Sequence, residues 1–179
     1  QECRQLDKAV TCYNKALAIK PDYAEALSNL GLTLQELSKL DEALVCYNQA
    51  LAIRPDYTEA HYNLGNTLQD LGRFSEAVVS YSKALTIKPD YTEAHNNLGN
   101  VLHILRKLDE AVDSYNAAIA INPNYAEAYS NLGNVLLDLG KLDEAVEKYH
   151  KAINIKPDFA TAYSNLGSAL QALGQPNKA

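Results

Sequence analysis

The chain has 179 residues, of which 47% are hydrophobic and 21% charged, a composition typical of soluble globular proteins rather than of disordered or membrane-spanning chains. Its formal net charge of -6 disfavours binding to the phosphate backbone of nucleic acids. No run of about 18 apolar residues or basic leader is present, so we expect neither a membrane span nor a targeting signal. Three cysteines without metal-type spacing favour a reducing compartment, and we expect a cytoplasmic protein.

A motif of isoleucine, proline and an aromatic residue recurs every 34 residues, first at Ile19 to Tyr23 and last at Ile155 to Phe159. The period divides the chain into a partial unit, four complete units and a second partial unit, which are 1–23, 24–57, 58–91, 92–125, 126–159 and 160–179. Methionine is absent, even from position 1. We therefore expect a fragment of a longer array, whose ends could associate with one another.

Each complete unit predicts two amphipathic helices joined by a short turn. In the first complete unit, apolar and small residues at helical spacing run from Ala26 to Leu37 and then from Ala43 to Leu51. The turn between them carries Ser38, and the later units have glycine or arginine in that place. A proline ends each second helix, because the residue before a proline disfavours helical dihedral angles.

Polar residues near the helix starts are interpreted as caps. The residues expected to cap the second helices are Asp41, Ser75, Asp109 and Asp143. The pairs that resemble capping boxes of the first helices are Asp56 with Glu59, Asp90 with Glu93, and Asn124 with Glu127. These positions explain the recurring glutamates structurally, without an acidic ligand-binding track.

A glycine lies inside every first helix, where it costs about 1 kcal/mol relative to alanine. These glycines are Gly31, Gly65, Gly99, Gly133 and Gly167. Small residues recur at the matching depth of the second helix, at Ala43, Ala77, Ala111 and Ala145. We interpret the glycines as packing devices for close contact between the two helices, not as phosphate-binding loops.

A 34-residue unit with Leu-Gly in its first helix, alanine in its second and a terminal proline resembles the tetratricopeptide repeat (TPR) family. The resemblance covers nearly the whole chain, although the tryptophan near the start of the family motif is missing. It implies an all-α fold, a right-handed superhelical solenoid of antiparallel helix pairs. It also implies that the first helices line an inner groove.

The sequence offers no pattern for catalysis or metal binding. His61 and His95 lie one repeat apart, about 10 Å, which is too far for one metal ion to bridge. His95 and His103 face different ways on one helix and are assigned no site. Cys12 and Cys46 are also one repeat apart, beyond the reach of a disulfide. We expect no enzyme activity, catalytic residue, metal ion or cofactor in this segment.

The polar face of the first helices carries two rows of asparagines. Numbered from the residue after the aromatic, position six is always asparagine, at Asn29, Asn63, Asn97, Asn131 and Asn165. A second row follows one turn later, at Asn66, Asn100 and Asn134. Asparagine costs several tenths of a kcal/mol in a helix relative to alanine, so its recurrence implies a compensating contact.

The asparagine rows predict binding of an extended polypeptide. An extended chain advances about 3.3 Å per residue and neighbouring repeats lie about 10 Å apart, so one asparagine would meet every third residue. An amide both donates and accepts hydrogen bonds, each contributing about 1 kcal/mol. The rows resemble the asparagine-lined arrays of O-linked N-acetylglucosamine transferases and SPINDLY-like proteins, where such amides hold substrate backbones. The alternative is that each amide bonds to the neighbouring repeat.

Charge narrows the expected partner. A dicarboxylate clamp of this family requires cations at positions two, five and six, where this chain has residues such as Glu59, Tyr62 and Asn63. Further polar and acidic residues on this face are Gln35, Gln69, Gln171, Glu36, Asp70 and Asp138. We therefore expect a neutral or basic extended protein or peptide partner, and neither nucleic acid nor membrane. Two alternatives stay open: a substrate-targeting region of a larger glycosyltransferase or sulfotransferase, or a self-assembling architectural array.

Overall fold

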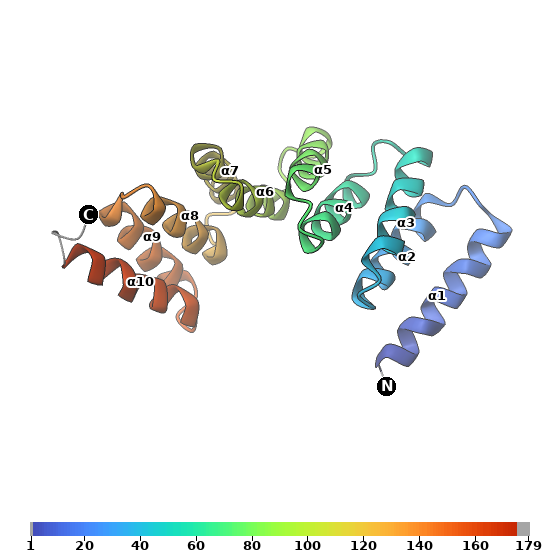
Figure 1. Ribbon diagram of the computed structural model, residues 1–179, viewed down its shortest axis with the longest axis horizontal. Helices are drawn as coiled ribbons and strands as arrows, with labels where there is room; N and C mark the ends of the chain where they lie inside the picture. Colours follow the sequence, from blue (N-terminus) through green and yellow to red (C-terminus); the bar gives the residue numbers. More distant parts are fainter. Residues whose placement is uncertain (1, 175–179) are drawn as a thin grey trace. The chain divides into compact units, whose positions relative to one another are not determined.

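A computed structural model describes residues 2–174 and their side chains from residue 5 onward, so both partial units extend beyond the described residues. In that range the chain forms α-helices joined by short turns (Figure 1). Their bounds are α1 Glu2–Ile19, α2 Ala24–Glu36, α3 Leu40–Ile53, α4 Thr58–Asp70, α5 Phe74–Ile87, α6 Thr92–Ile104, α7 Leu108–Ile121, α8 Ala126–Asp138, α9 Leu142–Ile155 and α10 Ala160–Leu173. The predicted all-α fold with two helices per period is confirmed.

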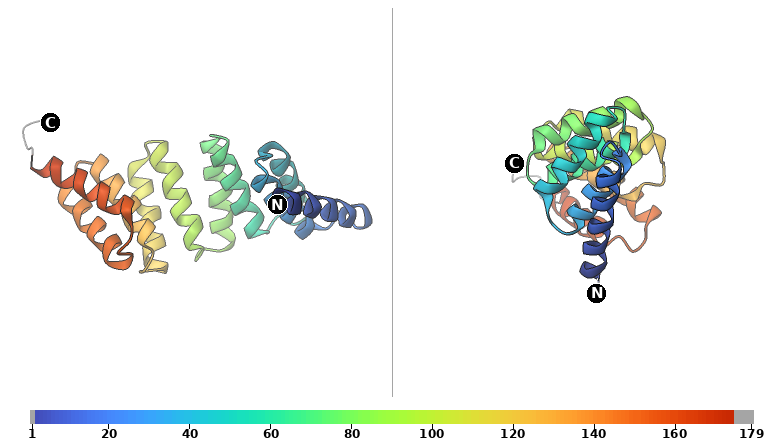
Figure 2. Two further views of the ribbon diagram at one scale, coloured as in Figure 1. Left: turned by 90° about the horizontal axis from the view of Figure 1, so that it is seen from below. Right: turned by 90° about the vertical axis from the view of Figure 1, so that its right-hand side faces the viewer.

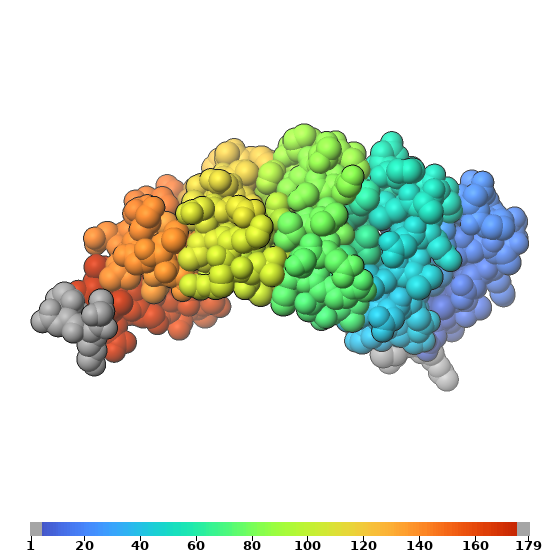
Figure 3. Space-filling view, turned by 45° about the horizontal axis from the view of Figure 1, so that its top comes forward, coloured from blue at the N-terminus to red at the C-terminus, as the bar shows by residue number. Residues whose placement is uncertain are grey.

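The helices belong to two compact units that divide between Pro89 and Asp90. In the first unit, α2 packs against α3 and α4 against α5, while α1 packs on α2 and α3 on α4. The second unit repeats this order, with α6 against α7, α8 against α9, and α10 against both α8 and α9 (Figure 2). Within the first unit, α3 to α5 form a continuous surface in the space-filling view (Figure 3).

The turn inside each helix pair depends on one residue in the left-handed conformation. Ser38, Gly72, Arg106 and Gly140 have φ angles of 58°, 72°, 60° and 74°. At the first of these turns, the Ser38 N–H donates to the Gln35 carbonyl and the Lys39 N–H donates to the Leu34 carbonyl. This pair of bonds is a Schellman motif, which satisfies the last carbonyls of the first helix. Glycine adopts the conformation without strain, whereas serine and arginine adopt it at a cost of about 1 kcal/mol.

Each helix pair encloses a buried tyrosine. Tyr47, Tyr81, Tyr115 and Tyr149 are at most 1% exposed. A Cβ atom added at Gly31, Gly65, Gly99 or Gly133 would lie 2.6 to 2.8 Å from the ring of the tyrosine 16 residues later. These four glycines are therefore packing devices, as predicted, whereas no neighbouring atom lies within 4 Å of a Cβ added at the fifth, Gly167. The four make room for a tyrosine ring, while the alanines Ala43, Ala77, Ala111 and Ala145 are buried elsewhere in the pair.

The predicted side-chain caps are wrong. The second helices begin two residues earlier than expected, and their N-cap residues Lys39, Arg73, Lys107 and Lys141 make no side-chain cap bond. The residues Asp41, Ser75, Asp109 and Asp143 consequently lie inside the first turn. There a carboxylate still stabilises the helix through its dipole, without accepting a cap bond.

The predicted capping boxes are also absent. Each first helix has an aromatic N-cap without a side-chain cap bond, such as Tyr57 before α4 and Tyr125 before α8. Two of the recurring glutamates form ion pairs instead: Glu25 binds Arg54 at 2.7 Å and Glu127 binds Lys156 at 3.1 Å. These pairs tie the start of a first helix to the end of the second helix of the same repeat.

Candidate functional site

The predicted asparagines lie on the first helices of the pairs. In the first compact unit, Asn29 is on α2, and Asn63 and Asn66 are on α4. In the second unit, Asn97 and Asn100 are on α6, Asn131 and Asn134 on α8, and Asn165 on α10. Asn29 is exposed, and the other seven are half-buried. Because α8 packs against both α6 and α10, the second unit brings five of the eight amides onto one face.

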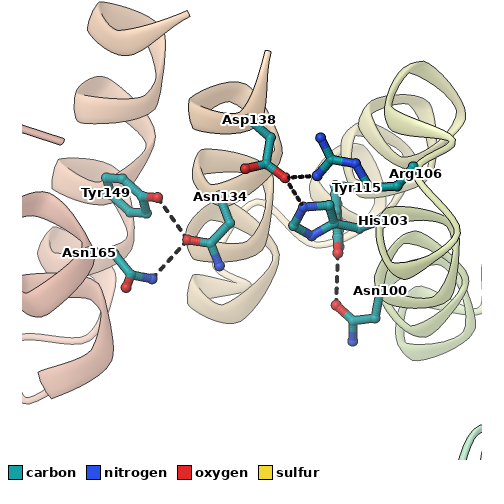
Figure 4. A network of polar contacts seen from close by, with 8 residues as sticks. All are labelled: Asn100, His103, Arg106, Tyr115, Asn134, Asp138, Tyr149 and Asn165. Atoms are coloured by element: carbon teal, nitrogen blue, oxygen red, sulfur yellow. Dashed lines mark hydrogen bonds and ion pairs between the residues drawn. The ribbon is translucent and has the colours of Figure 1, made fainter. Parts of the chain in front are cut away.

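In the second unit the amides join neighbouring first helices. The Asn131 Nδ2 of α8 donates to Asn100 Oδ1 and to Asn96 Oδ1 of α6, both at 3.1 Å. One repeat later, the Asn165 Nδ2 of α10 donates to Asn134 Oδ1 of α8 at 2.8 Å (Figure 4). Asn131 and Asn165 therefore bond to the neighbouring repeat, which was the alternative to ligand binding.

The buried tyrosines fix the orientation of the second asparagine row. The Tyr115 hydroxyl donates to Asn100 Oδ1 at 2.8 Å, and the Tyr149 hydroxyl donates to Asn134 Oδ1 at 2.7 Å (Figure 4). Burial raises the pKa of Tyr149 to about 12 and also raises that of Tyr115, so both phenols remain protonated donors at neutral pH. Each asparagine oxygen thus accepts from one tyrosine and one asparagine.

This bonding leaves a regular set of unused polar atoms. No described residue bonds to the Nδ2 of Asn100 or Asn134. Similarly, no described residue bonds to the Oδ1 of Asn131 or Asn165. Because an amide nitrogen donates and an amide oxygen accepts, this face offers both donors and acceptors.

The first complete repeat departs from this arrangement, whereas in the second the Tyr81 hydroxyl donates to Asn66 Oδ1 at 2.8 Å. In the first, Leu32 occupies the second-row position, so Gln35 takes over as the acceptor. The Gln35 Oε1 accepts from the Tyr47 hydroxyl at 3.4 Å and from Thr67 at 3.1 Å, and its Nε2 donates to Asp70 at 3.1 Å. The side-chain amides of Asn29 and Asn63 form no hydrogen bond with another described residue.

A charged cluster adjoins the amides in the second unit. The Asp138 Oδ2 of α8 accepts from His103 Nε2 of α6 at 2.9 Å and forms an ion pair with Arg106 in the turn after α6 (Figure 4). The hydrogen bond from His103, followed by that from Arg106, holds the pKa of Asp138 below its ordinary value. His103 therefore has a hydrogen-bond partner on the neighbouring first helix, and Arg106 compensates the negative charge of Asp138.

The side-chain contacts between repeats, which were not predicted from the sequence, join residues at fixed separations along the chain. The side-chain pair His103–Asp138 spans 35 residues, as does Gln35–Asp70. The amide pairs Asn100–Asn131 and Asn134–Asn165 both span 31 residues. Spacing within one helix cannot find such pairs. Comparison of polar residues 31 or 35 apart would have identified them.

A cavity of about 330 Å³ opens beside this cluster, within the size range of small-ligand sites. Its wall includes the amide-bonded residues Asn134, Tyr149 and Asn165, together with His103 and Asp138 of the charged cluster. Leu137 and Ser168 complete it. The cavity was not predicted, because its residues come from four different helices.

The remaining candidate residues have structural surroundings. His61 Nε2 contacts the Pro55 carbonyl at 2.9 Å. Cys12 is exposed, Cys46 is buried with a pKa raised by burial, and both are free thiols. Within the described range, no group of three or more histidine, cysteine, aspartate or glutamate side chains could hold a metal ion, and no helix is long and apolar enough to cross a bilayer.

Comparisons with known proteins give consistent results. The family model described as TPR repeat matches residues 2–38, 35–72, 68–106, 99–140 and 133–174. No curated protein matches the chain significantly.

Among solved structures, one of the MamA protein is 32% identical, covers 84% of this chain and 82% of that chain, and has a TM-score of 0.79. A second MamA structure is 26% identical, with coverages of 87% and 91% and a TM-score of 0.82. YrrB, described as a TPR protein with an unusual peptide-binding site, is 26% identical, with coverages of 93% and 84% and a TM-score of 0.78.

Proposed function

This chain belongs to the TPR repeat family, and we propose that it is a non-catalytic scaffold that binds an extended polypeptide on the asparagine-bearing face of its first helices. The supporting observation is the fixed orientation of the amides on α6, α8 and α10, which leaves donors and acceptors unused. The peptide-binding site named for YrrB favours the same class of ligand. The proposed site residues are Asn29, Asn63, Asn97, Asn131, Asn165, Asn66, Asn100 and Asn134.

The unused atoms are complementary to a peptide backbone. The Nδ2 groups of Asn100 and Asn134 can donate to backbone carbonyls, and the Oδ1 of Asn131 can accept from a backbone N–H. Each such bond contributes about 1 kcal/mol regardless of the ligand's side chains. Asn131 therefore has two roles, because its nitrogen joins α8 to α6 while its oxygen remains available to the ligand. We therefore expect the chain to bind peptides with modest affinity and little sequence specificity.

The charges support a neutral or basic partner. In the first unit, the Asp70 carboxylate accepts a bond from the neutral Gln35 rather than from a cation, which favours a basic ligand segment. In the second unit, Arg106 compensates Asp138, and a neutral segment fits better there. The free thiols support a reducing location, and we infer the cytoplasm.

The test is a pair of double variants that differ in the atoms offered to the ligand. Asn100→Asp with Asn134→Asp keeps an oxygen acceptor for Tyr115 and Tyr149 but removes both free donors. The matched control is Asn116→Asp with Asn154→Asp, two exposed positions on α7 and α9 that add the same charge. Twelve-residue peptides selected from a random library on the wild-type chain serve as probes in fluorescence anisotropy.

We expect the variant with Asn100→Asp and Asn134→Asp to bind these peptides at least about tenfold more weakly. Two lost hydrogen bonds of about 1 kcal/mol each together exceed the 1.4 kcal/mol that corresponds to a tenfold change in affinity. The control should bind within about twofold of wild type, and both should keep the helical circular dichroism spectrum. For uncharged peptides, affinity should also change little between low and moderate salt, since amide-to-backbone bonds are not ionic. Equal binding by the two double variants would contradict the proposal.

A further inference from the structure

The two carboxylate oxygens of Asp138 have different surroundings. Oδ2 accepts both the His103 and the Arg106 bonds. Oδ1 has no partner among the described residues, and Figure 4 shows it directed away from Arg106, toward the side where Asn134 and Tyr149 lie. That side is the wall of the 330 Å³ cavity. The cavity therefore contains an oriented acceptor that the fold does not use.

The same wall supplies an unused donor. Asn134 lies one helical turn before Asp138 on α8, and its oxygen is occupied by Tyr149 and Asn165. Both N–H groups of its Nδ2 remain, one for a backbone carbonyl and one for a ligand in the cavity. Side chains four residues apart on a helix have Cβ atoms about 5–6 Å apart. A carboxamide spans that gap by donating one hydrogen bond and accepting another, each about 2.9 Å long. Leu137 adds apolar surface beside the pair.

Charge selects among the possible occupants. Arg106 already compensates the Asp138 carboxylate, so an incoming ammonium group gains little Coulomb energy and meets a neighbouring cation. An incoming carboxylate would face the unpaired Oδ1 and be repelled. A neutral group with both a donor and an acceptor has neither disadvantage.

We propose that this cavity is a binding site for a primary carboxamide, whose NH₂ donates to Asp138 Oδ1 and whose C=O accepts from Asn134 Nδ2. In a bound polypeptide the carboxamide would belong to a glutamine or asparagine side chain. That second step rests on the proposed function, whereas the carboxamide site itself does not. The site adds one point of side-chain selectivity to an otherwise backbone-directed surface.

The experiment uses small probes and the whole isotopically labelled chain. Propionamide, propionate and propylammonium are titrated separately, and NMR follows the Asn134 side-chain NH₂ and the Leu137 methyl signals. We expect propionamide to bind at least about fivefold more tightly than either charged probe. Equal binding of the three probes, or a preference for a charged one, would overturn the proposal.

Three variants assign the effect to the cavity. Asp138→Ala removes the acceptor and should weaken propionamide binding at least about fivefold. Asp70→Ala changes the equivalent aspartate of another repeat and should leave the binding unchanged. Arg106→Gln removes the compensating charge and should shift the preference toward propylammonium, an outcome that simple loss of folding does not produce. Unchanged propionamide binding by Asp138→Ala would refute the assignment.

A peptide arm separates this inference from the proposed function. Alternating Ser-Ala peptides carry one central guest residue, either glutamine, glutamate or lysine. If these peptides bind without favouring glutamine and propionamide shows no selectivity, the cavity inference fails while backbone binding stands. If propionamide binds selectively but no peptide binds, the carboxamide site is supported and the proposed function fails.

Discussion

Gly133 and Gly167 occupy the same repeat position but have different neighbours, and we predict opposite effects of alanine at the two sites. A Cβ atom at Gly133 would lie 2.6 Å from the Tyr149 ring, whereas no neighbouring atom comes within 4 Å of one at Gly167. Both glycines lie inside helices, where alanine is intrinsically better by about 1 kcal/mol. Gly167→Ala should therefore stabilise α10 by about that amount.

At Gly133 the steric cost exceeds the helix gain. The Tyr149 ring is fully buried and would have to move by about 1 Å to reach ordinary contact distance. Such overpacking costs typically about 1–3 kcal/mol. The shift also disturbs the 2.7 Å bond from the Tyr149 hydroxyl to Asn134, which contributes about 1 kcal/mol. After subtraction of the helix gain, Gly133→Ala should destabilise the chain by about 1–3 kcal/mol.

Urea unfolding followed by circular dichroism measures both variants. Because repeat arrays unfold in parts, amide hydrogen exchange in α8, α9 and α10 should accompany it. The two variants should differ by about 2–4 kcal/mol, with faster exchange in α8 and α9 for Gly133→Ala. If Gly133→Ala stabilises the chain as much as Gly167→Ala does, glycine is not needed for the tyrosine, and the packing argument is wrong.

Two further predictions concern the turns and the charged cluster. Ser38→Gly should raise the thermal midpoint and stabilise the chain by about 1 kcal/mol, because its φ of 58° strains serine, while Gly72→Ala at φ 72° should destabilise it similarly; midpoints that move the other way would contradict this. The folded-state pKa of Asp138 lies below its ordinary 3.8, so its pairing stabilises the fold above about pH 4 and ceases to do so as pH falls through the folded-state pKa. Carbon NMR titration should show that depressed pKa and its return toward 3.8 in Arg106→Gln, and an unchanged value would count against the ion pair.

The sequence predicted the repeat and its local structure because both depend on short-range rules. Helical periodicity located two helices per period, and the prolines such as Pro55 marked where second helices end. The turn position of Ser38 and Gly72 also followed from local chemistry. Even here the predicted N-caps were wrong by one or two residues, because the exact first helical residue depends on the geometry of the preceding turn.

The candidate site was predictable only in part. The asparagine rows were visible as a pattern, and helical spacing put them on one face of each first helix. Their bonding partners were not visible, because an amide can donate to or accept from any neighbour that the packing supplies. Asn131 and Asn165 bond to the preceding repeat, and this contact leaves only part of each amide for a ligand.

The sequence by itself determined the 34-residue period, the helix pairs and the polar face, since each follows from residue spacing along a single helix. Only the tertiary structure decided that a tyrosine ring fills the space at Gly133, and that His103 and Arg106 meet Asp138. Those contacts join residues that are 16 to 35 positions apart in the sequence, and they depend on how far one helix is shifted and rotated relative to the other. Packing of whole side-chain surfaces sets that offset, and no local sequence rule contains it.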